Sequence, residues 1–326
     1  MRALVCREWG PVEGLAIADV PPPVPASGEV LIAVKATAVN YADAIMVAGR
    51  YQTRPPLPFS PGLETAGVVT ACGDQVTRFR PGDRVMAILS HGGLAEMAVA
   101  AEADTFPIPP GMSFVEAGAF PVSYISSHVA IRWQGRLEPG ETLLVLGAAG
   151  GVGLAAIEIG KAMGARVIAA ASTPEKLAVA REHGADDLVN YGSESLVERV
   201  MALTADKGAD VCFDPVGGDL FDPALSSLGW GGRMLLIGFV GGVPAIPANR
   251  LLVKNRAALG SSLRHYRWNE PDKLRRSVDE LMRWYGEGKL RPCVSHRLPL
   301  EDGVQAIRLL TDRRAHGKVV VVVDPA

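Results

Sequence analysis

The first part of the chain contains short β-rich runs separated by turn residues. EVLIAVKATAV (29–39), TAGVVTAC (65–72) and DRVMAIL (83–89) are three such runs, and turns such as PPPVPASG and RPGD stand beside them. Short runs of this kind, with proline and glycine between them, are typical of irregular all-β domains. We therefore expect the chain to begin with a compact β-barrel.

From about residue 122 the pattern changes to an apolar strand, a glycine turn and an amphipathic segment. Apolar strands are predicted in TLLVLGA (142–148), ARVIAAAS (165–172), ADVCFDPVGG (209–218) and GRMLLIGFVGG (232–242), and helical segments such as PEKLAVAREHG lie between them. This alternation predicts a parallel sheet with helices on both faces.

The closing segment carries two helical patterns and a strand. PDKLRRSVDELMRWYGEGKL and LEDGVQAIRLLTDRRAHG predict helices, and KVVVVVD (318–324) predicts a strand. A lone helix and strand cannot form a core of their own, so we expect this segment to rejoin the first domain. The predicted organisation is a first domain over 1–121, a second over 122–260, and a return to the first over 261–326.

The glycine-rich turn AAGGVG (148–153) is the most distinctive local motif. It follows a predicted strand and opens a predicted helix, which is the context that a dinucleotide-binding turn requires. Gly150 and Gly153 fit a backbone that approaches a pyrophosphate and begins a helix, although Ala148 replaces the first glycine of GxGxxG. The alternative is a glycine turn that packs a helix tightly on a sheet.

The end of the second strand of this unit bears on the choice of cofactor. Sites that select NAD usually place an acidic residue there, but this chain has Ala171, Ser172 and Thr173. Ser172, Lys176 and Tyr191 could instead donate hydrogen bonds to a 2'-phosphate, which favours NADP(H). The alternative is that Ser172 caps the next helix and Lys176 lies on a solvated face.

Composition and charge exclude several classes of partner. Of the 326 residues, 48% are hydrophobic. The chain has 33 basic and 35 acidic residues, so it has no excess of basic residues to bind nucleic acid. We find no signal peptide and no apolar run of the ~20 residues that a membrane span needs, and therefore expect a cytoplasmic protein. Four cysteines without a CxxC pair suggest neither a zinc knot nor a disulfide framework.

Several segments together resemble one known family. AVNYADAIMVAGRYQ, PFSPGLETAGVV, GDRVMA, GAFPVSYISS, AAGGVG, FDPVGG and HGKVVVVVD are similar, in this order, to the zinc-free, quinone-oxidoreductase-like branch of the medium-chain dehydrogenases and reductases. The resemblance implies an α/β protein with a GroES-like β-barrel catalytic domain and a Rossmann domain with a doubly wound parallel sheet. It also implies that the cofactor, which the missing acid indicates to be NADPH, lies in the cleft between the domains.

The resemblance also predicts the absence of zinc. Zinc-dependent members carry a cysteine at the place of Asn40 and a histidine at the place of Leu63. A carboxamide and a leucine cannot replace thiolate and imidazole as zinc ligands. We therefore expect no metal in this protein.

The site residues are inferred from the same resemblance. Asn40, Asp43 and Tyr51 are expected at the catalytic cleft, where Asn40 and Tyr51 could hydrogen-bond the acceptor oxygen or the cofactor. The alternatives are that Tyr51 packs within its loop and that Asp43 braces a helix start. Beside Ser172, Lys176 and Tyr191, the cofactor contacts are expected from Ser126, Ala149, Gly150, Gly151, Val152, Gly153, Phe239 and Val240, of which the last two have an alternative role in strand core and turn.

Three functions are consistent with these features. The first is NADPH-dependent hydride transfer to a quinone, and the second is the same step onto an enone or an acryloyl-CoA-type thioester. The third is a non-catalytic NADPH-binding protein. PANRLLVKNRAALGSS (247–262) resembles the segment that pairs subunits in the family, so we expect a homodimer with a small-molecule partner and no nucleic acid or membrane.

Overall fold

The computed structural model describes residues 1–323 and divides the chain into two compact units. Unit 1 comprises residues 1–122 together with the segment that begins at Pro292, and unit 2 comprises residues 123–291. The predicted return to the first domain at residue 261 is therefore placed too early. Residues 261–291 remain in unit 2 because they pack there: Trp284 lies against the His128 ring with centroids 5.4 Å apart, and Trp133 Nε1 donates to Ser277 Oγ at 2.9 Å.

Unit 1 is built mainly from antiparallel strands. Its main sheet has the order β14-β15-β3-β4-β5-β7, β6 pairs with β3, and β1 pairs with β2. Its elements are β1 (Arg2–Val5), η1 (Val12–Gly14), β2 (Ala16–Asp19), β3 (Glu29–Val39), α1 (Tyr41–Val47), β4 (Glu64–Cys72), β5 (Arg84–Ile88), β6 (Met97–Ala101), η2 (Glu102–Asp104), β7 (Thr105–Pro107), α2 (Phe114–Gly118), β14 (Val294–Pro299), η6 (Leu300–Asp302), α11 (Gly303–Thr311) and β15 (Lys318–Val322).

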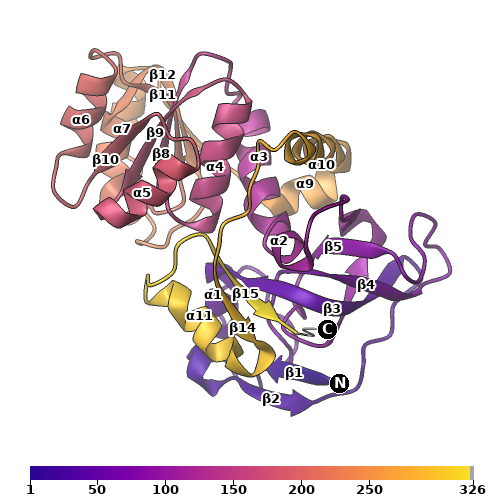
Figure 1. Ribbon diagram of the computed structural model, residues 1–326. Coiled ribbons are helices and arrows are strands. Elements are labelled where there is room, and N and C mark those ends of the chain that lie inside the picture. Colours follow the sequence, from indigo (N-terminus) through magenta and orange to yellow (C-terminus); the bar gives the residue numbers. More distant parts are fainter. Residues whose placement is uncertain (324–326) are drawn as a thin grey trace. The chain divides into compact units, whose positions relative to one another are not determined.

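In this sheet the closing strands join a strand from the first part of the chain. β15 runs antiparallel to β3 with Val319 opposite Val39, and β14 runs parallel to β15. Figure 1 shows the yellow closing strands beside the indigo β3. From residue 29 to residue 36, β3 alternates half-buried and buried positions, as expected for a strand with one face on a core, and its last residues are all buried. The predicted closing strand is present, and its last predicted residue, Asp324, lies outside the described residues.

Unit 2 is a parallel sheet covered by helices. The strand order is β10-β9-β8-β11-β12-β13, and every pairing is parallel. Helices lie against this sheet in Figure 1. The elements are η3 (Pro121–Ile125), α3 (Ser126–Val129), η4 (Ala130–Gln134), β8 (Thr142–Leu146), α4 (Gly151–Ala162), β9 (Arg166–Ala171), α5 (Pro174–Glu182), β10 (Asp187–Asn190), α6 (Leu196–Leu203), β11 (Ala209–Asp214), η5 (Gly218–Leu220), α7 (Phe221–Ser226), β12 (Leu228–Leu236), α8 (Ala248–Val253), β13 (Ala257–Gly260), α9 (Leu263–Asn269) and α10 (Pro271–Gly286).

The sheet of unit 2 confirms the alternation predicted from the sequence. β8 and β9 are almost wholly buried, which is typical of central parallel strands covered on both faces. The strand order reverses direction between β8 and β11, so this point is the topological switch point where open α/β sheets bind ligands.

Buried carboxylates hold the chain where it passes from one unit to the other. In unit 1, Glu64 Oε2 accepts from the backbone N–H of Val122 at 2.8 Å. In unit 2, Glu158 of α4 accepts from the backbone N–H of Arg291 at 3.0 Å and from the Tyr124 hydroxyl at 2.7 Å. Each crossing of the chain is thus anchored within a unit by a charge-assisted hydrogen bond.

Candidate functional site

The glycine turn after β8 requires glycine at two of its positions. Gly147 has a φ of +57°, and its carbonyl accepts from Gly150 N at 2.9 Å. A Cβ at Gly153 would lie 2.4 Å from Gly147 O, so no side chain fits there. Because Gly147 supplies the left-handed residue of the turn, the fully buried Ala148 is tolerated at the first position of the motif.

The turn leads directly into the N-terminus of a helix. α4 begins at Gly151, its N-cap Gly150 provides no side-chain cap, and its first turn has no acidic residue. The first N–H groups of a helix lack partners within the helix, which makes this end suitable for a pyrophosphate. Ser127 Oγ donates to Val152 O at 3.0 Å, so the start of α3, where Ser126 lies, is attached to this turn.

The ends of β9 and β10 lie next to each other at two of the residues expected to bind a 2'-phosphate, Ser172 and Tyr191. The backbone N–H of Tyr191 donates to Ala171 O at 3.1 Å, directly before Ser172. Thr173, and not Ser172, is the N-cap of α5, with its hydroxyl accepting from Lys176 N at 3.4 Å. The alternative in which Ser172 caps this helix is therefore wrong, because the helix begins one residue later than that reading requires.

Across the switch point, the loops after β11 and β12 are hydrogen-bonded to each other. Gly241 N donates to Val216 O at 2.8 Å, and this loop carries Phe239 and Val240, which are 44% and 36% exposed. These two side chains are therefore not ordinary strand core. They present apolar surface close to the carboxyl ends of the strands.

Asp214, at the end of β11, is a candidate that the sequence analysis missed. Its Oδ1 accepts from the N–H groups of Val216 and Gly217, each at 2.8 Å, whereas its buried Oδ2 has no partner among the described residues. Burial raises the pKa of this carboxyl, against the lowering effect of the two N–H groups. A buried acceptor without a partner is a natural position for a ligand hydroxyl. The only signal of Asp214 in the sequence was an acidic residue at the end of an apolar strand.

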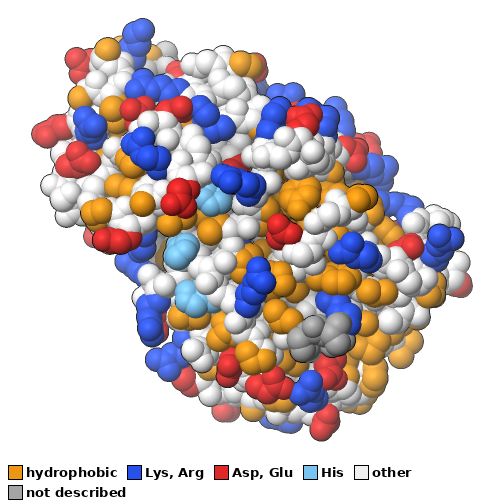
Figure 2. Space-filling model, viewed as in Figure 1, with side chains coloured by type: hydrophobic (Ala, Val, Ile, Leu, Met, Phe, Trp, Pro, Cys, Tyr) orange, Lys and Arg blue, Asp and Glu red, His pale blue; other side chains and the backbone are white. Residues whose placement is uncertain are grey.

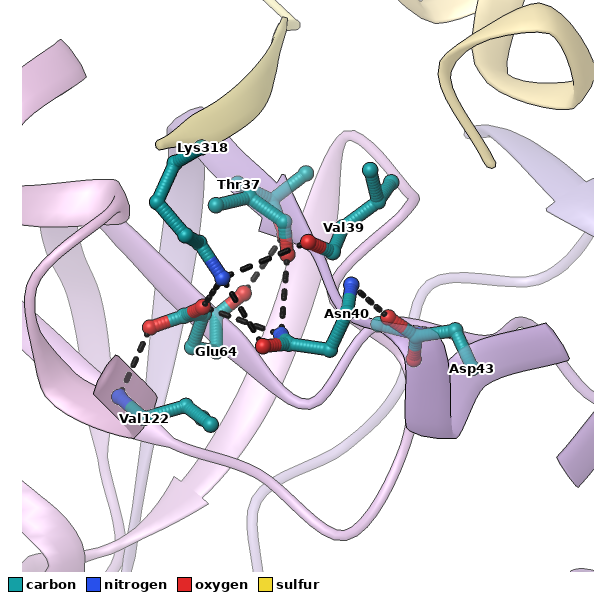
Figure 3. A network of polar contacts seen from close by, with 9 residues as sticks. Thr37, Val39, Asn40, Asp43, Glu64, Val122 and Lys318 are labelled. Atoms are coloured by element: carbon teal, nitrogen blue, oxygen red, sulfur yellow. Dashed lines mark hydrogen bonds and ion pairs between the residues drawn. The ribbon is translucent and has the colours of Figure 1, made fainter. Parts of the chain in front are cut away.

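In unit 1, Asn40 takes part in a buried polar network (Figure 3). Asn40 is the N-cap of α1, and its Oδ1 accepts from Lys318 Nζ at 2.8 Å. Its Nδ2 donates to Glu64 Oε1 at 2.9 Å, and Lys318 Nζ donates to the same oxygen at 2.8 Å. Three elements far apart in the sequence, β4, β15 and the start of α1, thus meet at one carboxamide.

Asp43 is fully buried behind Asn40. Its Oδ2 accepts from Asn40 N at 2.7 Å and its Oδ1 accepts from Gly62 N at 3.0 Å. Burial raises the pKa of Asp43 to about 6, although these N–H groups and Lys318 act in the opposite direction. The contacts correspond to the bracing role considered for Asp43. Tyr51, beyond the end of α1, is half-buried and packs on the apolar core of unit 1.

The residues at the zinc-ligand positions of related proteins have other partners here. Asn40 contacts an ammonium and a carboxylate, and Leu63 belongs to the apolar core. Among residues 1–323 no group of three or more His, Cys, Asp or Glu side chains is arranged to hold a metal ion. The absence of zinc stays a prediction that elemental analysis can test.

Two family models match separate parts of the chain, and related proteins match nearly all of it. Residues 26–110 match the alcohol dehydrogenase GroES-like domain, and residues 151–281 match the family described as zinc-binding dehydrogenase. Quinone oxidoreductase-like protein 2 from Bos taurus is 37% identical over 98% of this chain and 92% of its own length.

Solved structures agree with this assignment. A probable oxidoreductase from Mycobacterium abscessus is 36% identical, with a TM-score of 0.90 over 99% of this chain and 98% of that chain. The Escherichia coli quinone oxidoreductase complexed with NADPH is 28% identical, with a TM-score of 0.92 over 99% of this chain and 100% of that chain.

These matches confirm the expected combination of a GroES-like domain with a Rossmann-type parallel sheet, and they support an oxidoreductase that uses a nicotinamide cofactor. In the part of the chain that the structure describes, none of the helices has the length and apolar character needed to cross a membrane. The chain therefore belongs to the medium-chain dehydrogenase/reductase superfamily, in its quinone oxidoreductase branch.

Proposed function

We propose that this protein transfers a hydride from NADPH to a quinone without a metal ion. The observation that carries the cofactor assignment is the edge of unit 2, where a glycine turn opens α4 and where Ser172, with Lys176 nearby, follows the end of β9 in place of an acid. A quinone is proposed because the E. coli neighbour is a quinone oxidoreductase, and its structure is a complex with NADPH.

Within this proposal each part of unit 2 has a separate task. The α4 N-terminus and the residues from Ala149 to Gly153 hold the pyrophosphate, Ser126 contributes a hydroxyl, and Ser172, Lys176 and Tyr191 bind the 2'-phosphate. Phe239 and Val240 offer an apolar wall to the nicotinamide, which supplies the hydride when bound. Asp214 Oδ2 accepts a hydrogen bond from a ribose hydroxyl.

In unit 1, Asn40 and Tyr51 orient the acceptor. A quinone that receives a hydride and one proton becomes a hydroquinone, and water can supply that proton. The chain therefore needs groups that hold the quinone oxygen and exclude solvent, but no obligatory acid. Basic and acidic side chains are interspersed over the face shown in Figure 2, which suits a small uncharged acceptor better than a polyanion.

The experiment is a screen for oxidation of NADPH and of NADH with quinones, enones and acyl-CoA thioesters. Turnover with quinones would support the proposal. Turnover with enones or thioesters alone would show that the acceptor belongs to that class and is not a quinone. Tight NADPH binding without any turnover supports a non-catalytic binding protein. Gly153→Val is the cofactor-binding control because its side chain would meet Gly147 O, and Gly286→Ala, with open space around it, is the matched neutral variant.

We further propose a homodimer formed along the edge of unit 2. β13 is the last strand of the sheet, and the neighbouring Trp230, Val243, Leu252 and Val253 are each more than two-thirds exposed. An uncovered strand edge flanked by exposed apolar side chains is typical of an interface between copies. The cytoplasmic location stays a prediction.

A further inference from the structure

We propose that Lys318 and Glu64 are positioning residues that hold the Asn40 carboxamide in one orientation, so that it offers its nitrogen, and not its oxygen, to the acceptor. The inference rests on the proposed function for the role of Asn40. It concerns two residues at the boundary of β15 and in β4 that the family resemblance did not assign to the site.

All three hydrogens of the Lys318 ammonium have acceptors within the network. Nζ has three hydrogens and contacts three acceptors, Asn40 Oδ1 and Glu64 Oε1 at 2.8 Å each and Val39 O at 3.3 Å. The Lys318 side chain is 7% exposed. Lys318 therefore has no hydrogen left for a substrate, and its effect on the reaction must pass through its partners.

Glu64 is fixed just as firmly. Its side chain is fully buried, Oε1 accepts from both Lys318 and Asn40, and Oε2 accepts from Val122 N at 2.8 Å. Figure 3 shows the carboxylate between these donors. A buried ion pair contributes little net stability, because desolvation offsets the attraction. The ion pair instead fixes the geometry of Asn40, because both charges are directed at its carboxamide.

The carboxamide has only one favourable orientation between these charges. In the observed arrangement Oδ1 faces the ammonium and Nδ2 faces the carboxylate. A flip would place the NH2 group against the ammonium and the carbonyl against the carboxylate, so both contacts would become repulsive. The remaining Nδ2 hydrogen has only Ala38 O, at 3.4 Å, as a partner among the described residues. This hydrogen is the donor available to an acceptor oxygen.

The kinetic test compares Lys318→Met/Glu64→Gln with Asn40→Ala and with the triple variant. The paired substitution removes both charges, so no unpaired buried charge remains to unfold the protein. We expect a loss of about tenfold in kcat/KM for the acceptor, the size of one hydrogen bond to a charged network, with NADPH affinity unchanged. In the Asn40→Ala background the same pair should cost less than about twofold, because nothing is left to position.

Lys161→Met is the matched control, since it breaks the half-exposed ion pair of Lys161 with Asp186 in unit 2. It should leave kcat/KM unchanged. Equal losses from the paired substitution with and without Asn40 would overturn the inference, because they would show a general structural effect. Full activity in the paired variant would overturn it as well.

A second measurement needs no substrate. The chain has five asparagines, so 15N-asparagine labelling gives few side-chain signals, and Asn40→Ala identifies the one of interest. We expect the Asn40 Nδ2 hydrogen that is bonded to Glu64 to exchange slowly with solvent, and to exchange fast in the paired variant. Unchanged exchange would refute the inference even for a protein without turnover. An absence of turnover in the parent protein would contradict only the proposed function.

Discussion

Lys176 provides a direct test of cofactor choice because the fold gains little from it. It is the third residue of α5, near the positive end of the helix dipole, where a cation is unfavourable. Its ammonium has no acidic partner among the described residues, whereas Lys161 contacts both oxygens of Asp186 at 2.8 Å. Lys176→Ala should therefore leave the free energy of unfolding unchanged or raise it slightly.

The expected effect on binding follows from the charge of the 2'-phosphate. A hydrogen bond to a charged group is worth about 1.5–3 kcal/mol, and partial exposure of Lys176 places this contact at the lower end of that range. About 1.4 kcal/mol corresponds to a tenfold change in dissociation constant. NADPH should therefore bind about tenfold more weakly to Lys176→Ala, and NADH, which lacks the phosphate, should change by less than about twofold.

The assay is titration of each reduced cofactor by fluorescence at low and high salt. Lys176→Arg should retain most of the NADPH preference, Lys161→Ala should behave as the parent, and salt should weaken NADPH binding more in the parent than in Lys176→Ala. Equal weakening of NADPH and NADH would refute the reasoning. So would a parent protein that binds the two cofactors equally.

Three further predictions address the acceptor, the buried carboxyl and the dimer. Tyr51→Phe should keep most of the turnover with a modest rise in KM, and Tyr51→Ala should lose more because it also opens the pocket to water; loss of hydride transfer in the Phe variant with both ligands bound would make the phenol a required proton donor. Asp43 has a pKa of about 6 in the folded state against about 3.9 unfolded, so folding takes up a proton between these values. Relative to Asp43→Asn, the free energy of unfolding should fall by about 2 kcal/mol from about pH 4.5 to about pH 7 in urea titrations, and parallel pH profiles would contradict this. Leu252→Glu, at a side chain 78% exposed, should convert a dimer into a monomer in light scattering after gel filtration; an unchanged dimer would exclude the β13 edge.

The parts of the fold that depend on local patterns were predictable from the sequence. β8, the glycine turn and α4 follow one another within twenty-one residues, and each leaves a distinct pattern of apolar residues and glycines. The position of α10 was not predictable in the same way. Its amphipathic pattern shows that one face is buried but not which core buries it, and the contact of Trp284 with His128 in unit 2 decides that question.

The network around Asn40 shows the same limit for the site. Asn40 was assigned from the family resemblance, but Lys318 lies 278 positions further along the chain and opens a strand, where a lysine is usually solvated. The only signals in the sequence were Lys318, at the edge of one apolar run, and Glu64, within another. Pairing two such residues requires the register of β15 on β3, which no local pattern encodes.

The return of the chain to unit 1 determines the order in which the protein can fold during synthesis. Unit 2 is one continuous segment and is complete once Arg291 has been made, whereas the sheet of unit 1 lacks β14 and β15 until the last described residues emerge. At about 5–20 residues per second, unit 1 remains open for several seconds after unit 2 can fold. Because Lys318 arrives with β15, the Asn40 carboxamide acquires this contact only after residue 318 has been made. A ribosome that stalls within α11 would thus carry a chain in which all of unit 2 has been made while the sheet of unit 1 still lacks β15.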